Sequence, residues 1–173
     1  MFFSVRKNMR ASLKSKCDFD SWSDFMFEYD FCYDDILSSS VVIKDGILFD
    51  DERFSFESYW ENGFNHYERL FYSTGNGEKA PFSGILYKLY PNGRISGYSF
   101  YKDGYQEGQN VDYYDNGVLS KYSNFNRLNS NVLIIKWFRN GTISEVMELT
   151  DHGRHKKYVV YDENRNIIKQ GEI

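Results

Sequence analysis

The sequence predicts a mainly β protein, an elongated and twisted antiparallel sheet of β-hairpin repeats of about 24 residues each. An N-terminal cap segment without the repeat precedes this sheet. Three observations support the prediction: an Asn-Gly pair recurs at a fixed spacing, apolar and polar residues alternate before each pair, and aromatic residues make up 19% of the chain. Aromatic side chains suit the half-buried surface of a pleated sheet.

The Asn-Gly pair marks the repeat. It occurs at Asn92-Gly93, Asn116-Gly117 and Asn140-Gly141, each 24 residues after the last, and Asn164-Arg165 is a degenerate copy one period later. An earlier copy, Asn62-Gly63, lies 30 residues before Asn92. Two residues before each asparagine the chain has, in order, Trp60, Tyr90, Tyr114, Phe138 and Asp162. A fixed period in this range is typical of repeat proteins, whose units bury their apolar faces by stacking on neighbours.

Each period is predicted to hold two strands. Asn-Gly between alternating segments indicates a β-hairpin, because both residues tolerate the positive φ angles of a type I′ turn. A second turn in each period is marked by Lys102-Asp103-Gly104, by residues 126–130 and by Asp151-His152-Gly153. The strands that enter the Asn-Gly turns alternate with period two. One face takes Tyr87, Leu89, Val111, Tyr113, Ile135, Trp137, Val159 and Tyr161, and the other takes Lys88, Asp112, Lys136 and Val160.

The pattern divides the chain into two regions. Residues 1–58 form the acidic, aromatic-rich cap segment, and residues 59–173 form the repeat domain. Within the cap, residues 41–49 are predicted to form a hairpin about Asp45-Gly46, as an eroded first repeat. The cap either closes the array of repeats or selects the partner.

A run of aromatic residues in the cap has two interpretations. Strict alternation from Phe25 to Tyr33 favours a strand. The apolar spacing from Trp22 to Leu37 fits a helix that begins near Ser21 equally well.

The repeat resembles the variant MORN repeat of bacterial YwqK-like antitoxins, over about residues 59–173. The likeness is carried by residues 81–93, 101–108 and 113–117, in which Tyr-x-Asn-Gly and Gly-x8-Asn-Gly recur in phase. Members of that family are β-hairpin repeat proteins encoded beside polymorphic or contact-delivered toxins, and act as their immunity proteins. The last two copies depart from the pattern at Val132, Lys156 and Arg165, which stand where the family pattern has glycine.

The resemblance implies that this protein binds and neutralises a cognate bacterial toxin, forming a heterodimer with it and carrying no catalytic residues or cofactor. A MORN-type scaffold that binds a protein or lipid surface is the alternative. The two differ in the partner they need, so binding to anionic vesicles favours the scaffold and binding to a toxin favours immunity.

The net charge of −4 is unevenly distributed. Residues 1–16 hold five basic residues and no acid, whereas residues 17–61 hold thirteen acids against Lys44 and Arg53. The acidic block repels nucleic acid and attracts a basic partner. Without an organised apolar face, the basic N-terminal stretch indicates a solvated terminus rather than a contact with nucleic acid or membrane. Neither a membrane-spanning run nor a secretory signal is recognisable, so a cytoplasmic location is expected.

Residue types that carry catalysis or bind metals are scattered. His66 stands alone after a turn, and His152 and His155 flank a glycine without a third ligand nearby. Cys17 and Cys32 have no histidine beside them in the sequence, which favours inert thiols. We therefore predict neither a catalytic nor a metal site.

Two further motifs have structural interpretations. Residues 73–79, Ser-Thr-Gly-Asn-Gly-Glu-Lys, lack the spacing of a phosphate-binding loop and are predicted to form an extended loop between repeats. Neighbouring carboxylates, in Asp34-Asp35 and in residues 50–52, could supply an acid and a base, but acidic turns that solvate an aromatic-rich sheet explain them without chemistry.

The acidic block is the predicted partner-binding region. It contains both the acids and twelve aromatic residues within positions 17–61, and it lies mostly outside the repeats. Nuclease toxins carry basic clefts, so acidic groups would speed association with such a toxin while buried aromatic residues hold the complex. The predicted contact residues are Asp34, Asp35, Asp50, Asp51 and Glu52. In the competing interpretation, these acids only keep an aromatic-rich segment soluble.

Overall fold

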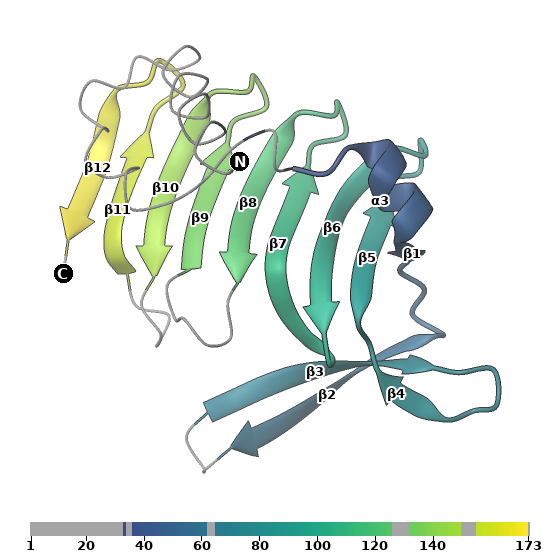
Figure 1. Cartoon of the computed structure of the whole chain (residues 1–173). Coiled ribbons are helices and arrows are strands. Elements are labelled where there is room, and N and C mark those ends of the chain that lie inside the picture. Colours follow the sequence, from purple (N-terminus) through teal and green to yellow (C-terminus); the bar gives the residue numbers. More distant parts are fainter. Residues whose placement is uncertain (1–32, 34–35, 62–64, 126–131, 150–154, 173) are drawn as a thin grey trace, which may run out of the picture. The chain divides into compact units, whose positions relative to one another are not determined.

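The protein is mainly β, as the sequence predicts. The computed structural model describes residues 33, 36–61, 65–125, 132–149 and 155–172. Residues 38–173 form one compact unit, which contains the strands and helix that are labelled in Figure 1. Residues 38–58 therefore belong to the same compact unit as the repeats. The aromatic run, predicted as a strand over residues 25–33 or a helix over residues 22–37, lies outside the described residues except at Tyr33, Ile36 and Leu37.

The larger sheet has nine strands in the order β1-β5-β6-β7-β8-β9-β10-β11-β12. From β5 onward each strand pairs with the next in chain order and runs antiparallel to it (Figure 1). Its strands are β1 (Ile47–Leu48), β5 (Gly84–Leu89), β6 (Ile95–Lys102), β7 (Tyr105–Tyr113), β8 (Leu119–Phe125), β9 (Val132–Trp137), β10 (Ile143–Leu149), β11 (His155–Tyr161) and β12 (Ile167–Glu172). The predicted meander of hairpins is therefore confirmed over β5 to β12.

The Asn62-Gly63 copy belongs to a second, smaller sheet. This sheet has the order β2-β3-β4, with β2 (Phe54–Glu61), β3 (Asn65–Ser73) and β4 (Lys79–Pro81). β2 and β3 form a long hairpin, whereas β4 pairs with only Phe71, Tyr72 and Ser73 of β3. The Asn62-Gly63 hairpin thus lies in a different sheet from the hairpins that begin at β5.

The two faces of the nine-stranded sheet follow the predicted alternation. Residues that pair directly across strands lie on the same face. The apolar face carries the row Tyr87, Tyr98, Val111, Tyr122, Ile135, Val146 and Val159. The polar face carries the row Lys88, Gly97, Asp112, Lys121, Lys136, Glu145, Val160 and Lys169. Val111, Ile135 and Val146 are fully buried, which makes the apolar row the centre of the sheet's core.

The Asn-Gly turns are longer than the predicted two-residue type I′ turns. In the first of them, Tyr90 N–H donates to the carbonyl of Arg94 (2.8 Å) and Gly93 N–H donates to the carbonyl of Tyr90 (2.9 Å). Gly93 has φ 80°, whereas Asn92 is not among the residues with positive φ. This geometry is a type I turn followed by a left-handed glycine that forms a β-bulge, and the strand register shifts at Leu89 accordingly. The type I′ prediction is therefore wrong for these turns.

The asparagine of the motif has its own role in this longer turn. Its side-chain oxygen accepts a hydrogen bond from the backbone N–H two residues later, at Arg94 (3.0 Å), Val118 (3.1 Å) and Thr142 (2.9 Å). Such Asx turns hold the backbone in a bend without requiring a positive φ at asparagine. In the last copy Arg165 takes the left-handed position with φ 69°.

Residues 73–79 form a turn of the same kind. Thr74 N–H donates to the carbonyl of Glu78 (2.8 Å), Gly77 N–H donates to the carbonyl of Thr74 (2.9 Å), and Gly77 has φ 82°. The turn connects β3 to β4 directly, so the predicted extended loop is wrong. Asn76-Gly77 is a further copy of the turn that lies outside the 24-residue phase.

Type I′ geometry occurs instead at the second turn of the first unit. Asp103 and Gly104 are the two residues between Lys102 and Tyr105, which pair with each other, and they have φ angles of 52° and 81°. Two central residues with positive φ define this turn type. The corresponding second turns at residues 126–130 and 151–153 lie outside the described residues.

The predicted hairpin about Asp45-Gly46 is a helix followed by a short strand. Helix α3 (Ser39–Asp45) is capped by the hydroxyl of Ser38, which accepts from Val41 N–H at 3.4 Å. Val42 is fully buried, and Gly46 N–H donates to its carbonyl as the helix ends. β1 then pairs in parallel with β5. Burial of one apolar helix residue and a capping hydroxyl outweigh the local β propensity of Val41, Val42 and Ile43.

A compact aromatic core joins the two sheets. Phe54, Leu70, Phe82 and Leu86 are buried together, and Tyr101 packs against them. Phe54 contacts the rings of Phe49, Tyr72 and Phe82 at centroid distances of 5.6, 5.2 and 5.4 Å. Burial of such large side chains and edge-to-face ring contacts are major sources of stability.

Three backbone hydrogen bonds close a ring at the same junction. Leu70 N–H donates to the carbonyl of Gly104 (2.8 Å), Gly104 N–H donates to the carbonyl of Phe82 (2.7 Å), and Phe82 N–H donates to the carbonyl of Leu70 (3.0 Å). The side chain of Arg69 also donates from Nε to the carbonyl of Asp103 (2.8 Å). The β6–β7 turn is thus held against β3 by direct bonds, which fixes the small sheet beside the large one.

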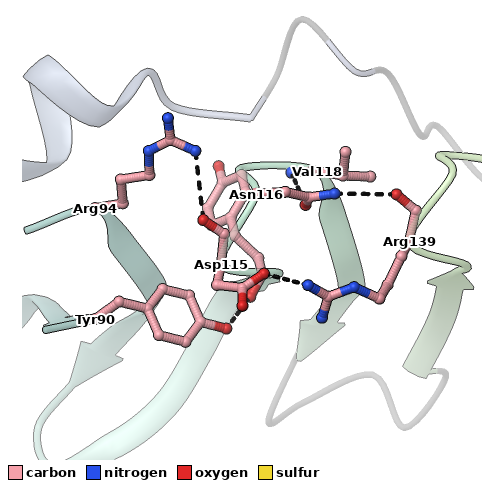
Figure 2. A network of polar contacts seen from close by, with 7 residues as sticks. Tyr90, Arg94, Asp115, Asn116, Val118 and Arg139 are labelled. Atoms are coloured by element: carbon pink, nitrogen blue, oxygen red, sulfur yellow. Dashed lines mark hydrogen bonds and ion pairs between the residues drawn. The ribbon is translucent and has the colours of Figure 1, made fainter. Parts of the chain in front are cut away.

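Neighbouring Asn-Gly turns are linked by side chains (Figure 2). Arg94 donates to the carbonyl of Asp115 (3.3 Å), and the Asn116 side chain donates to the carbonyl of Arg139 (3.2 Å). Arg139 also forms an ion pair with the carboxylate of Asp115 and stacks on the ring of Tyr114, its guanidinium carbon 5.1 Å from the centroid. Residues 24 positions apart are therefore in contact along this end of the sheet.

Candidate binding site between the two sheets

A groove lies on the polar face of the large sheet where the small sheet meets it. Its volume is about 180 Å³. The polar lining comes from Lys88 on β5 and from Ser96, Ser99, Asn110 and Asp112 on β6 and β7, and the aromatic lining includes Phe49 and Phe56. Phe49 follows β1 and Phe56 belongs to β2, so the groove depends on segments from both sheets.

The polar lining is ordered by a chain of hydrogen bonds. Ser99 donates from Oγ to Asn110 Oδ1 (2.7 Å), and Asn110 donates from Nδ2 to Ser123 Oγ (3.3 Å). The three residues pair across β6, β7 and β8, which holds their side chains on one face. Because the chain of bonds fixes the Asn110 amide, its orientation toward a bound group is set in advance.

Asp112 is the one acidic residue among those that line the groove. It is half-buried, and burial raises the pKa of its carboxyl, while the nearby charges of Lys121 and Lys88 act in the opposite direction. Gly97 lies opposite it on β6, and a Cβ added to Gly97 would come within 2.7 Å of Asp112 Oδ1. A side chain at position 97 would therefore displace the carboxylate, which needs the space that glycine leaves.

The aromatic lining is held from several sides. Phe49 N–H donates to the carbonyl of Tyr87 (2.7 Å), which places Phe49 at the edge of β5. The ammonium of Lys88 lies 4.4 Å from the centroid of the Phe49 ring. Phe56 is 52% exposed, so an aromatic surface faces solvent at the groove.

The acidic turn at residues 50–52 follows Phe49 directly. Asp50 accepts from Glu52 N–H (3.0 Å) and from Arg53 Nε (2.9 Å), so its carboxylate is engaged within the turn. Asp51 and Glu52 are exposed. Of the five acids predicted to contact a partner, two are thus exposed, at two and three residues after the groove residue Phe49, and one holds the turn. Asp34 and Asp35 lie outside the described residues.

The sequence predicts contact residues in the acidic turn but does not predict the groove, whose lining contains none of the five predicted acids. The groove's polar residues lie on strands that the sequence assigns to the repeat scaffold. For Asp112, the sequence predicts only a position on the polar face of the sheet. Gly97 was the available signal, because a glycine inside a strand often marks a close approach of another group. Within the described ranges, no group of three His, Cys, Asp or Glu residues is arranged to hold a metal ion, and no helix is long and apolar enough to cross a membrane.

Comparisons with protein-family models, with curated proteins and with solved structures gave no match for this chain.

Proposed function

We propose that this protein is an immunity protein that binds and neutralises a toxin with a basic surface, as the resemblance to YwqK-like antitoxins implies. The observation that supports the proposal best is the continuity of Phe49 with the acidic turn: Phe49 lines the groove, and the exposed residues Asp51 and Glu52 follow it within three positions of the chain. Interfaces combine buried aromatic anchors with charged groups that steer the encounter. A basic cleft of a nucleic-acid-cleaving toxin has the charge that complements this surface.

The repeated sheet supplies the rigid support for such a surface. The groove residues of β6 and β7 are fixed by strand pairing on both sides and by the junction with the small sheet. A rigid surface loses little conformational entropy on binding, which favours tight association.

The test begins with the gene next to this chain: if it encodes a secreted protein, the C-terminal domain of that protein is used for growth rescue and binding kinetics. Co-expression of the unmodified chain is expected to restore growth, and the purified pair is expected to associate faster at low salt than at high salt. In the variant D51K/E52K, association at low salt should slow by about tenfold or more and depend less on salt. Asp50 is left unchanged in this variant because it holds the turn.

The matched control is E78K, which reverses an exposed acid in the β3–β4 turn without touching the groove. It should associate at the unmodified rate. Equal rates for D51K/E52K and the unmodified chain would rule out the acidic turn as a contact. Failure of the unmodified chain to bind the toxin or restore growth, together with binding to anionic vesicles, would favour the MORN-type scaffold instead.

A further inference from the structure

The groove between the sheets has the size of a site for one side chain. Pockets that hold small molecules or cofactors are typically about 300–1,000 Å³. The groove measures about 180 Å³, which is well below that range. Its lining combines aromatic rings with a short row of polar groups, as in pockets that receive an anchoring side chain at a protein interface.

The charge at the polar end of the groove is incompletely balanced. Asp112 makes no hydrogen bond and no ion pair with any residue that the structure describes. Lys88 and Lys121 influence its pKa from a distance, but neither ammonium forms an ion pair with it. The Lys88 ammonium lies over the Phe49 ring instead. A half-buried carboxylate without a direct partner has lost hydration that a bound cation would replace.

We propose that the groove receives a cationic side chain of the partner, arginine or lysine, with its charged head against the Asp112 carboxylate and its stem along Phe56. This inference rests on the proposed function, because it names the group of the toxin that the groove binds. The ring of Phe56 is exposed and can stack on a guanidinium or cover the methylene stem of lysine. Arginine fits best, because its planar head can donate to the carboxylate and stack on a ring at once.

Asn110 favours a bound side chain that can donate a hydrogen bond. Its Oδ1 already accepts from Ser99 Oγ, which leaves one lone pair directed away from that bond. Its Nδ2 is engaged by Ser123. The amide can therefore accept a further hydrogen bond from an arginine N–H, in addition to the bond that Asp112 accepts.

The experiment uses capped tripeptides as probes and amide NMR spectra of the full chain as the readout. Acetyl-Gly-Arg-Gly-amide is titrated in parallel with its citrulline counterpart, which has nearly the same shape without the charge, and its glutamate counterpart. We expect saturating shifts of the Gly97, Ser99 and Asn110 amides with the arginine peptide. The D112N variant should bind it at least about fivefold more weakly, and E78Q should bind it as the unmodified chain does.

Three results would overturn the inference. Equal binding of the citrulline peptide would show that charge is not recognised. Preferential binding of the glutamate peptide would show that Lys88 and Lys121 dominate the groove. Unchanged arginine binding in D112N, with a spectrum that shows the variant folded, would remove Asp112 from the site.

The peptide experiment and the toxin experiment can fail separately. If the chain neutralises the toxin but ignores the arginine peptide, the groove inference falls and the immunity function stands. If the peptide binds but no toxin is neutralised, the groove is a cation-binding pocket and the immunity function falls.

Discussion

The hydroxyl of Tyr90 donates a 2.7 Å hydrogen bond to the backbone carbonyl of Tyr113 in the next repeat. Tyr114 makes the same bond to the carbonyl of Trp137, also at 2.7 Å. At Tyr90 and Tyr114, the half-buried aromatic residue two positions before the asparagine is therefore a tie between units. Phe138 occupies the third such position and lacks the hydroxyl.

Removal of one tie should lower stability measurably. Y114F loses the bond to Trp137 and leaves a half-buried carbonyl without that donor, so the free energy of unfolding should fall by about 0.5–1.5 kcal/mol. Urea denaturation measures this change. The matched control is Y87F, since the hydroxyl of Tyr87 makes no hydrogen bond with the described residues. An equal loss in both variants would contradict a specific role for the tie.

Addition of the missing tie should have the opposite effect. In F138Y the new hydroxyl is positioned, by analogy with Tyr90 and Tyr114, to reach the carbonyl of Tyr161. We expect the free energy of unfolding to rise by up to about 1 kcal/mol. A decrease would show that the third unit differs in geometry from the first two.

Gly104 should tolerate no side chain. A Cβ there would lie 2.7 Å from the carbonyl oxygen of Leu70 and 2.6 Å from Arg69 Cγ, and φ is 81°. G104A must therefore break the ring of backbone bonds that joins the two sheets, at a cost of about 2 kcal/mol or more. G75A is the control, because its Cβ meets nothing within 4 Å and its backbone needs no positive φ. Thermal unfolding of the two variants should differ clearly, and similar values would disprove the importance of the ring.

Arg165 is strained where the other copies have glycine. It adopts φ 69° in the last turn, and a left-handed residue with a side chain costs about 1–2 kcal/mol. R165G should raise the free energy of unfolding by about 0.5–1 kcal/mol, after allowance for the greater freedom of glycine in the unfolded chain. G141R, the reverse change in the preceding copy, should lower it. Urea denaturation that shows R165G to be less stable would contradict this account.

Asp112 should make the protein less stable as pH rises. Its pKa is raised above the ordinary value of 3.8, mainly by burial. The folded state therefore holds the proton more tightly than the unfolded state, and stability falls as pH rises from about 3.8 to the raised value. D112N removes this loss, so its advantage over the unmodified chain should grow with pH across that window. Urea denaturation at several pH values measures it, and a constant difference would refute the sign.

Asp162 should act in the opposite direction. Hydrogen bonds from the side chain and backbone of Asn166 lower its pKa from 3.8. The stability that it contributes is fully present above 3.8 and is lost as pH falls through the lowered value. In the same denaturation series, the free energy of unfolding of D162N should fall less than that of the unmodified chain as the pH drops below 3.8. A larger loss in acid for D162N would contradict this assignment.

Local sequence patterns predict the strands of the large sheet because the alternation and the Asn-Gly motif that define each repeat involve residues close together in the sequence. Alternation assigned Val111 and Ile135 to one face and Lys88 and Asp112 to the other, and the strand register confirms both. The turn type was wrong because Asn-Gly is compatible with two loop lengths. The bulge that decides between them depends on the flanking strands.

The remaining differences depend on contacts between distant residues. Helix α3 forms because Val42 is buried and Ser38 caps the helix, against the local propensity of a β-branched run. The groove joins Phe56 of the small sheet to Asp112 of the large one. No sequence spacing places those two residues together, so the site appears only with the fold.

The hydrogen bonds of Tyr90 and Tyr114 repeat from one unit to the next, so the sheet can be lengthened by adding whole units. Each 24-residue unit contributes two strands, and neighbouring strands are about 4.8 Å apart. One additional unit would thus displace β12 from the groove by about 10 Å while every residue kept its face and its phase. In a sheet of this kind, whole units can be added or removed in the middle, and the distance between its two ends then changes in fixed steps while the residues at each end stay the same.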